Sequence, residues 1–176
     1  CSSDLAAVLG LDVDRVDEVC AEARATIPGS YVTVANHNSS APSQVVIAGD
    51  QAGVDLATEK CKAAGARRIV PLVVGGAFHS PAMAPAREGL ARAVSMAVVG
   101  EARVPLVANV TGRAIRRRRE VRDELSEQVT SRVRWAESMA TLASAGCVRF
   151  IEFGAGAVLS GLVQRAVPGA QVIQVG

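Results

Sequence analysis

The fold is decided by the stretch QVVIAGDQAGVDLATEKCKAAGARRIVPLVV, residues 44–74. Its apolar run over 44–48 predicts a strand, and Asp50 is a favourable N-cap for a helix. That helix is expected over 51–64, because apolar residues recur at helical spacing and a glycine follows the last of them. A second strand is expected over 67–74. The stretch is therefore a strand, a helix and a strand in succession.

The residues before this stretch repeat its pattern. An apolar run over 5–9 predicts a strand, and Asp12 or Asp14 can cap the amphipathic helix that follows. A Pro-Gly turn then leads into an alternating strand over 31–35. The resulting order, βαββαβ with two matched helices, is typical of a ferredoxin-like subdomain, which we place at residues 1–74.

Beyond residue 74 helices alternate with apolar segments, a pattern typical of an α/β layer fold. A second subdomain of this kind is expected over 75–176. Helices are expected from Ser80 to about Val98 and over 120–130, 135–145 and 157–167, with strands over 104–110, 149–153 and 171–175. Ser80 followed by Pro81 is a strong helix start, and the strand over 149–153 is expected to be buried.

Composition narrows the class of protein. Apolar residues make up 49% and charged residues 20% of the 176, which excludes a disordered chain. Aromatic residues make up only 3%, which argues against a stacking surface for nucleic acid and predicts a core of small aliphatic side chains. No apolar run is long enough to span a membrane. The four cysteines form no CxxC pair, so we expect no metal site and a cytoplasmic protein with reduced thiols.

Basic residues concentrate between Arg113 and Arg122, although the net charge of the chain is only +2. Such a cluster either binds phosphate or an acidic partner, or lies in solvent where a loop enters a helix. No aromatic side chain interleaves with the arginines, which argues against nucleic acid as the partner. An acidic carrier protein remains open.

Two histidines are candidates for chemistry. His79 lies in the segment 75–83, GGAFHSPAM, between the carboxyl end of a strand and the start of a helix, where α/β folds place catalytic groups. The two glycines of this segment favour a functional site over a histidine that only fills a loop. For His37, in NHNSS at 36–40, an exposed histidine in a polar turn is the favoured interpretation; the flanking asparagines could instead face a ligand.

A further glycine pair, Gly154 and Gly156, follows a strand and precedes a helix. It is only part of a dinucleotide-binding fingerprint, because the third glycine is misplaced, and we expect no nucleotide cofactor. The free backbone N–H groups at the start of the helix could receive an anion.

Four motifs together resemble one enzyme family. In order and spacing, the motifs are similar to those of malonyl-CoA:acyl-carrier-protein transacylases and of the acyltransferase domains of polyketide synthases. They are NHNSSAPSQVVIAG (36–49), GGAFHSPAM (75–83), QVTSRVRW (128–135) and EFGAGAVLSGL (152–162). The resemblance covers the carboxyl-terminal half of such an enzyme. It implies a ferredoxin-like small subdomain and the C-terminal part of an α/β-hydrolase-like large subdomain.

The resemblance also implies a mechanism. In the family, a serine on a GHSxGE elbow attacks the malonyl thioester while a histidine takes its proton, and the phosphopantetheine thiol of an acyl carrier protein then removes the malonyl group. No cofactor is implied. GHSxGE does not occur in this sequence, so the resemblance implies a missing N-terminal half as a partner, and we interpret the start at Cys1 as a cut. An apolar sheet edge should be exposed where the missing strands belong.

Site residues are carried over by position in the motifs. His79 matches the catalytic histidine, and Gln128 matches the residue whose carbonyl or amide orients it. Phe78 matches the position where a phenyl ring selects malonyl over methylmalonyl by filling the space of an α-methyl group, a difference of roughly 1–3 kcal/mol. Asn38 and Gln44 match a loop that borders the acyl pocket. The alternative is an inactive fragment or a module that binds a carrier protein.

Overall fold

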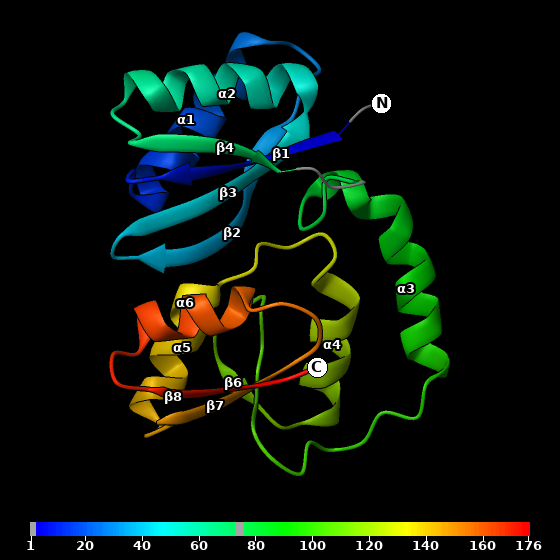
Figure 1. Ribbon diagram of the computed structural model, residues 1–176. Helices are drawn as coiled ribbons and strands as arrows, with labels where there is room; N and C mark the ends of the chain where they lie inside the picture. Colours follow the sequence, from blue (N-terminus) through cyan, green and yellow to red (C-terminus); the bar gives the residue numbers. More distant parts are fainter. Residues whose placement is uncertain (1–2, 73–75) are drawn as a thin grey trace.

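The computed structural model describes residues 3–72 and 76–176 (Figure 1). The predicted cut at Cys1, the predicted boundary between 74 and 75 and the end of the strand expected over 67–74 lie outside the described residues. In chain order the elements are β1 Ser3–Leu9, α1 Val13–Thr26, β2 Val32–Ser40, β3 Ser43–Asp50, α2 Gln51–Ala63, β4 Arg68–Leu72, η1 Pro81–Met83, α3 Ala84–Met96, β5 Leu106–Val107, β6 Ala114–Ile115, α4 Arg118–Glu127, α5 Trp135–Ser144, β7 Arg149–Phe153, α6 Val158–Ala166 and β8 Gln171–Val175.

The first part of the chain forms one four-stranded sheet. Its strand order is β2-β3-β1-β4, and every neighbouring pair is antiparallel. This is the order that a ferredoxin-like βαββαβ unit requires, so the predicted architecture is confirmed. Helices α1 and α2 lie side by side on one face of the sheet, in the upper part of Figure 1.

The core lies between these helices and the sheet. Along β1, Ala6 and Val8 point toward the helices, while Leu5 and Ala7 point to the opposite face, as the two-residue period of a strand demands. All buried members of the main cluster are small aliphatic side chains or cysteines, as predicted: Ala6, Val8, Val16, Val19, Cys20, Ala23, Val32, Val34, Val45, Ile47, Val54, Ala57 and Cys61. Burial raises the pKa of the Cys20 thiol to about 12 and that of Cys61 to about 11.

Asp50 joins β3 to α2 as predicted. Its carboxylate accepts hydrogen bonds from the backbone N–H of Gly53 at 2.8 Å, the hydroxyl of Ser30 at 2.7 Å and the backbone N–H of Tyr31 at 2.6 Å. Partial desolvation alone would raise the pKa of this carboxyl, but the three hydrogen bonds together lower it. The residue therefore caps the helix and fastens the start of β2 at the same time.

Strand β2 is longer than predicted, because it continues through residues that we expected in a polar turn. A segment far along the chain pairs with its outer edge: His37 donates its backbone N–H to the carbonyl of Val133 at 2.9 Å, and Val133 donates its own to Ala35 at 2.8 Å. Residues 36–40 are held extended by pairing with β3 on one side and by these two bonds on the other. The sequence around residues 36–40 does not indicate that Val133 pairs with them.

The predicted strand over 104–110 is wrong for most of its length. Only Leu106 and Val107 pair, with the short strand β6. The carboxylate of Glu124 in α4 accepts the backbone N–H groups of Asn109 at 2.8 Å and Val110 at 3.2 Å, so these groups do not enter a strand ladder. The predicted helices of this part are confirmed with ends shifted by a few residues.

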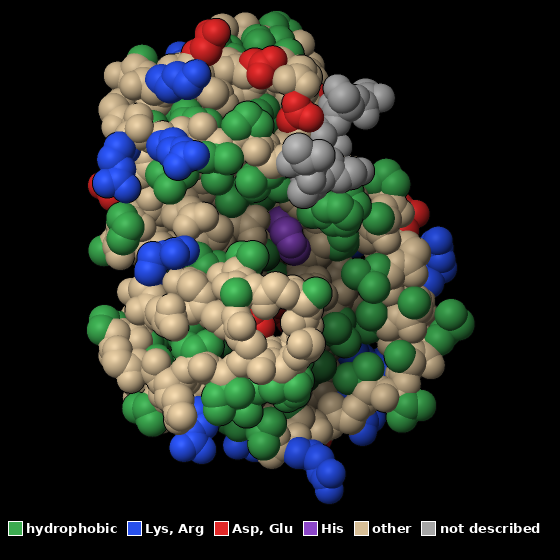
Figure 2. Space-filling view, in the orientation of Figure 1, with side chains coloured by type: hydrophobic (Ala, Val, Ile, Leu, Met, Phe, Trp, Pro, Cys, Tyr) green, Lys and Arg blue, Asp and Glu red, His purple; other side chains and the backbone are tan. Residues whose placement is uncertain are grey.

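Strands β7 and β8 form a parallel pair that α6 connects. Contrary to prediction β7 is not buried: 51% of Ile151 and 76% of Phe153 are exposed, and Ile173 and Val175 of β8 are exposed as well. This matches the expected exposed apolar sheet edge. Figure 2 shows hydrophobic side chains spread over the surface of the lower part of the molecule. Among the described residues, no helix has the length and apolar character needed to cross a bilayer.

Candidate active site

His79 lies in a tight turn between β4 and η1. Ser80 is completely buried, and its hydroxyl donates to the carbonyl of Ala77 at 2.6 Å. That side chain therefore closes the turn instead of capping the helix as predicted. At the tip His79 has a φ of 61°, and it is the only residue other than glycine with a positive φ in the described part of the chain. Such backbone strain is concentrated at functional sites.

Two carbonyl groups just beyond α4 hold His79. Its ring Nδ1 lies 2.8 Å from the backbone carbonyl oxygen of Gln128, and its backbone N–H donates to the carbonyl of Val129 at 3.0 Å. A carbonyl can only accept, so Nδ1 carries the proton of the neutral ring and the lone pair lies on Nε2. Of the two possibilities for Gln128, the structure places the backbone carbonyl against the ring; sequence reasoning missed Val129, although it lies in the same motif.

The segment QVTSRVRW, 128–135, connects this histidine to the sheet. Its first two residues contact His79, and Val133 pairs with β2 five residues later. Between them Arg132 reaches helix α1, where its Nη2 lies 2.5 Å from the Asp17 carboxylate, and its Nε donates to the carbonyl of Val34 at 3.4 Å. The motif thus fixes the histidine relative to the ferredoxin-like subdomain.

Phe78 precedes His79 and is 44% exposed. Its ring packs close to Gly76, where an added Cβ would lie 3.4 Å from Phe78 Cε2. The ring is therefore partly at the surface, on the residue directly before His79.

The structure does not bring Asn38 and Gln44 to His79. Both lie near the free end of the β2-β3 hairpin, and no hydrogen bond joins either of them to His79 within the described ranges. Asn38 lines a cavity between this hairpin, α5 and α6. Gln44 accepts a hydrogen bond from Arg165 of α6 through its Oε1 at 3.3 Å. Their place in an acyl pocket stays a prediction.

The interpretation of His37 as an exposed histidine in a turn is wrong. It lies in a strand and only 7% of it is exposed, because α5 covers it. Its ring Nδ1 is 3.2 Å from Glu137 Oε2 of that helix, 100 residues further along the chain.

The glycine turn 154–156 does not offer a free anion site. The carboxylate of Glu152, from the end of β7, already accepts the backbone N–H groups of Leu159 at 3.1 Å and Ser160 at 2.8 Å, and the hydroxyl of Ser160. The hydroxyl contact, together with the two backbone bonds, lowers the pKa of Glu152. The chain thus satisfies the start of α6 with its own carboxylate.

The arginine cluster is only partly a free surface. The backbone N–H groups of Arg116 and Arg117 donate to Glu120, and Arg119 lies 3.8 Å from Asp123. Arg122 turns inward, where its Nη2 donates to the carbonyl of Ala97 at 3.0 Å. Among the residues that the structure describes, no three or more His, Cys, Asp or Glu side chains come together in a group that could hold a metal ion.

An apolar groove of about 290 Å³ lies beside β7 and β8. Apolar side chains of α5, α6 and both strands line it, together with Trp135, whose buried Nε1 has no hydrogen-bond partner within the described chain. The groove adjoins the exposed apolar face of the two strands and shares Ile151 with it.

Known proteins resemble the chain over nearly its whole length. A family model described as an acyl transferase domain matches residues 8–175. The malonyl CoA-acyl carrier protein transacylase of Bacillus subtilis is 40% identical over 161 residues, which are 92% of this chain and 50% of that protein. The one from Haemophilus influenzae is 37% identical over 96% of this chain and 53% of its own length.

Solved structures agree. The crystal structure of MCAT from Streptococcus pneumoniae superposes with a TM-score of 0.90 at 36% identity, covering 99% of this chain and 55% of that one. A type II PKS acyl-carrier protein in complex with its malonyl-transacylase gives a TM-score of 0.89 at 34% identity, over 99% and 55% of the two chains. The chain thus spans about half the length of the relatives that it matches. By sequence and by fold, it belongs to the acyl transferase domain family.

Proposed function

We propose that this chain is the carboxyl-terminal part of a malonyl-CoA:acyl-carrier-protein transacylase and that His79 is its general base. The observation that carries the proposal is the bond from Nδ1 of His79 to the carbonyl of Gln128, which leaves Nε2 able to accept a proton. The relatives that match over more than nine tenths of the chain are transacylases of this kind by name.

In the proposed reaction the nucleophile is a serine on the segment that this sequence lacks. Its hydroxyl proton passes to Nε2 of His79 as its oxygen bonds to the malonyl carbonyl carbon, and the coenzyme A sulfur leaves with that proton. In the second half of the cycle the phosphopantetheine thiol gives its proton to the same nitrogen, its sulfur takes the malonyl group, and the serine recovers a proton. No cofactor takes part in either half.

His79→Ala in the complete enzyme tests this role. We expect malonyl transfer to fall by about 10²–10⁴-fold, the usual contribution of a positioned general base. Glu88→Ala, an exposed residue of α3, is the control and should keep full activity. Transfer by the His79→Ala enzyme within a few-fold of the wild type would refute the proposal.

A second variant separates the two ways in which Gln128 could orient the ring. Because the backbone carbonyl makes the contact, Gln128→Ala should retain malonyl transfer within about tenfold, far above His79→Ala. A loss as large as that of His79→Ala would instead assign the role to the side-chain amide.

Phe78 is the proposed selector of the acyl group. Its partly exposed ring, on the residue directly before His79, supports the steric prediction that it excludes an α-methyl group. Phe78→Ala should raise the ratio of methylmalonyl to malonyl transfer by about 10-fold or more. The proposed role of Asn38 and Gln44 as acyl-pocket residues rests on their positions in the 36–49 motif.

The partners follow from the same proposal. The acceptor is an acyl carrier protein, as in the solved complex of a PKS acyl-carrier protein with its malonyl-transacylase. A segment with the serine elbow would pack on the exposed apolar face of β7 and β8 and on the adjoining groove, which has the character of an unfinished core. We also propose that the boundary between the two subdomains lies between residues 74 and 75. A cytoplasmic location is proposed as well, and the free, buried thiols of Cys20 and Cys61 support it.

A further inference from the structure

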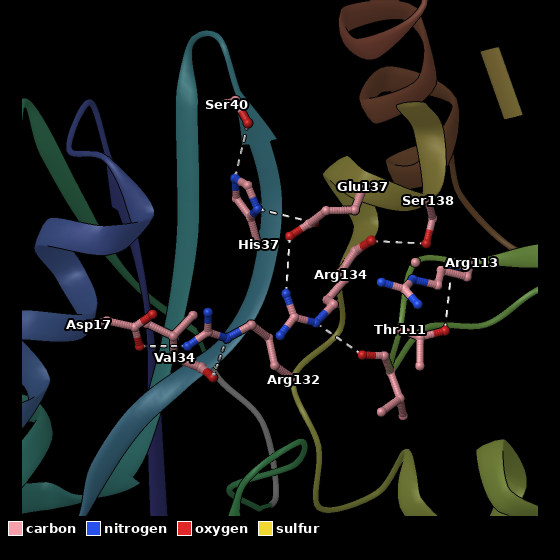
Figure 3. Close-up of polar contacts among 12 residues, drawn as sticks. Asp17, Val34, His37, Ser40, Thr111, Arg113, Arg132, Arg134, Glu137 and Ser138 are labelled. Atoms are coloured by element: carbon pink, nitrogen blue, oxygen red, sulfur yellow. Dashed lines mark hydrogen bonds and ion pairs between the residues drawn. The ribbon is translucent and has the colours of Figure 1, made fainter. Parts of the chain in front are cut away.

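Three polar side chains lie in series at the far end of the β2-β3 hairpin (Figure 3). The hydroxyl oxygen of Ser40 is 3.2 Å from Nε2 of His37, and Nδ1 of His37 is 3.2 Å from Oε2 of Glu137. Ser40 and His37 belong to β2, while Glu137 belongs to α5. No residue of this series belongs to the site around His79.

The pairing of the two ring nitrogens gives each group a role. A carboxylate accepts, so Nδ1 of His37 donates to Glu137 and the lone pair of Nε2 faces the Ser40 hydroxyl. A nucleophile bonded to a base that a third group orients is the arrangement that activates serine in acyl transfer. The sequence did not reveal it because the carboxylate comes from 97 positions or more beyond the other two groups.

The surroundings hold the base and the carboxylate in place. His37 is buried, and its backbone is fixed by the bond to Val133. Arg134 holds the carboxylate from the other side, because its Nη1 lies 3.4 Å from Glu137 Oε1 while its Nε donates to the carbonyl of Val110 at 3.0 Å. The backbone bond to Val133 and the contact of Nδ1 with Glu137 thus limit the movement of the His37 ring.

Ser40, in contrast, is exposed and lines a cavity of about 210 Å³. The rest of the lining is partly apolar, from Ala41, Ala136, Met139, Ala140 and Ala166, and partly polar, from Asn38, Ser39 and Arg165. Ordinary sites for drug-sized ligands have volumes of about 300–1,000 Å³, so this one suits an acyl group of only a few carbon atoms.

We propose that Ser40, His37 and Glu137 form a second acyl-transfer site, which takes short-chain acyl esters and hydrolyses them. The Ser40 oxygen bonds to the carbonyl carbon as its proton passes to Nε2 of His37, and the ester C–O bond breaks as the leaving alcohol takes that proton. Water then attacks the acyl-serine, gives a proton to the same nitrogen, and releases the acid as Ser40 regains its proton. The net reaction is ester plus water to acid plus alcohol.

The test uses the chain itself and does not need the serine elbow. A fluorophosphonate probe should phosphonylate Ser40 with loss of fluoride, and mass spectrometry of the peptides locates the label. The same chain should hydrolyse p-nitrophenyl acetate. Ser40→Ala should lose the label and the hydrolysis, whereas Ser95→Ala, which removes another exposed hydroxyl, should keep both. A label that stays on the Ser40→Ala chain, or none on the wild type, would overturn the proposal.

Two further variants test the relay. His37→Asn and Glu137→Gln should each slow labelling by about 10²-fold or more, the latter because an amide N–H facing Nδ1 favours the tautomer that carries its proton on Nε2. Thermal melting followed by circular dichroism shows whether each variant folds. If His37→Asn does not fold, Glu137→Gln decides: labelling at the wild-type rate in a folded Glu137→Gln chain contradicts the relay. Because His79 is not involved, His79→Ala should label Ser40 at the wild-type rate, so the outcome is independent of the proposed transacylase function.

Discussion

The two halves of the chain differ in how completely they bury their apolar side chains. In the ferredoxin-like half, α1 and α2 cover the sheet, and residues such as Val8 and Ile47 are fully buried. In the other half, β7 and β8 leave Ile151 and Phe153 largely in solvent. Strands of both halves carry apolar side chains at alternating positions. Whether a strand forms a core therefore depends on what covers it and not on its sequence alone.

The two halves therefore differ in the interactions that stabilise them. In the first half, α1 and α2 cover one face of the sheet, while the buried cluster on its other face includes Ala77 from beyond β4. The second half buries fewer apolar side chains, such as Met139, Leu162 and Val163. Hydrogen bonds of Glu124 and Glu152 and the contacts of the 128–135 segment also hold it. In the proposed complete enzyme, further strands would bury its apolar face.

The largest expected difference between the two halves is in the rate at which their cysteine thiols react. Because burial raises the pKa of Cys20 to about 12 and of Cys61 to about 11, their thiolate forms are scarce and they should be alkylated by iodoacetamide at least about a hundredfold more slowly than an ordinary thiol. Cys147, only half-buried, should react readily. Peptide mass spectrometry after a short exposure of the native chain checks this; fast alkylation of Cys20 would show that the first half opens easily.

Matched isoleucines test the comparison by stability. Ile47→Ala should lower the free energy of unfolding by about 3 kcal/mol, because it leaves a cavity in a closed core. Ile151→Ala should change it by less than about 0.5 kcal/mol in the chain alone. Urea titration measures both. In the complete enzyme Ile151→Ala should become clearly destabilising; an effect as small there would show that nothing covers β7.

Asp50 tests how firmly the first half is fastened. Asp50→Ala should cost about 1 kcal/mol, a typical value for the loss of an N-cap. Since the folded state lowers the pKa of this carboxyl, its contribution is full above the ordinary pKa of about 3.9 and is lost as the pH falls through the lower folded value. Melting curves at pH 7 and at pH 2 should therefore differ less for Asp50→Asn than for the wild type.

The smallest effect is expected at Glu152. Glu152→Gln should speed amide hydrogen exchange at Leu159 and Ser160 without unfolding the first half. The pKa of Glu152 is lowered in the fold, so this protection should be complete above the ordinary pKa of about 4.3 and be lost only as the pH falls through the lower folded value. Unchanged exchange at both amides would mean that the carboxylate does not cap α6 in solution.

The sequence predicts the first half well because its signals are local. The cap at Asp50 and the glycine after α2 mark ends that later residues do not alter. The small aliphatic composition of the core is predicted as well, because it needs only the scarcity of aromatic residues in the sequence.

The errors occur where distant segments meet. The local sequence of His37 is typical of a turn, but Val133 and Glu137 of the other half hold this residue in a strand. Residues 104–110 have the pattern of a strand, but Glu124 binds the backbone N–H groups at its end. The contact between His79 and Gln128 was expected only through resemblance, and the choice of the backbone carbonyl needed coordinates. Local periodicity holds no information on such pairings.

The positive φ of His79 has a consequence for evolution at this position. Glycine adopts this conformation without penalty and asparagine tolerates it, whereas alanine is disfavoured there by roughly 1–2 kcal/mol. A saturation series at residue 79 should therefore give two opposite orders: glycine and asparagine above alanine for folding, and histidine alone for proton transfer. Substitution by the residue that best suits the backbone would remove the imidazole, so the proposed proton transfer would account for a histidine in a place suited to glycine.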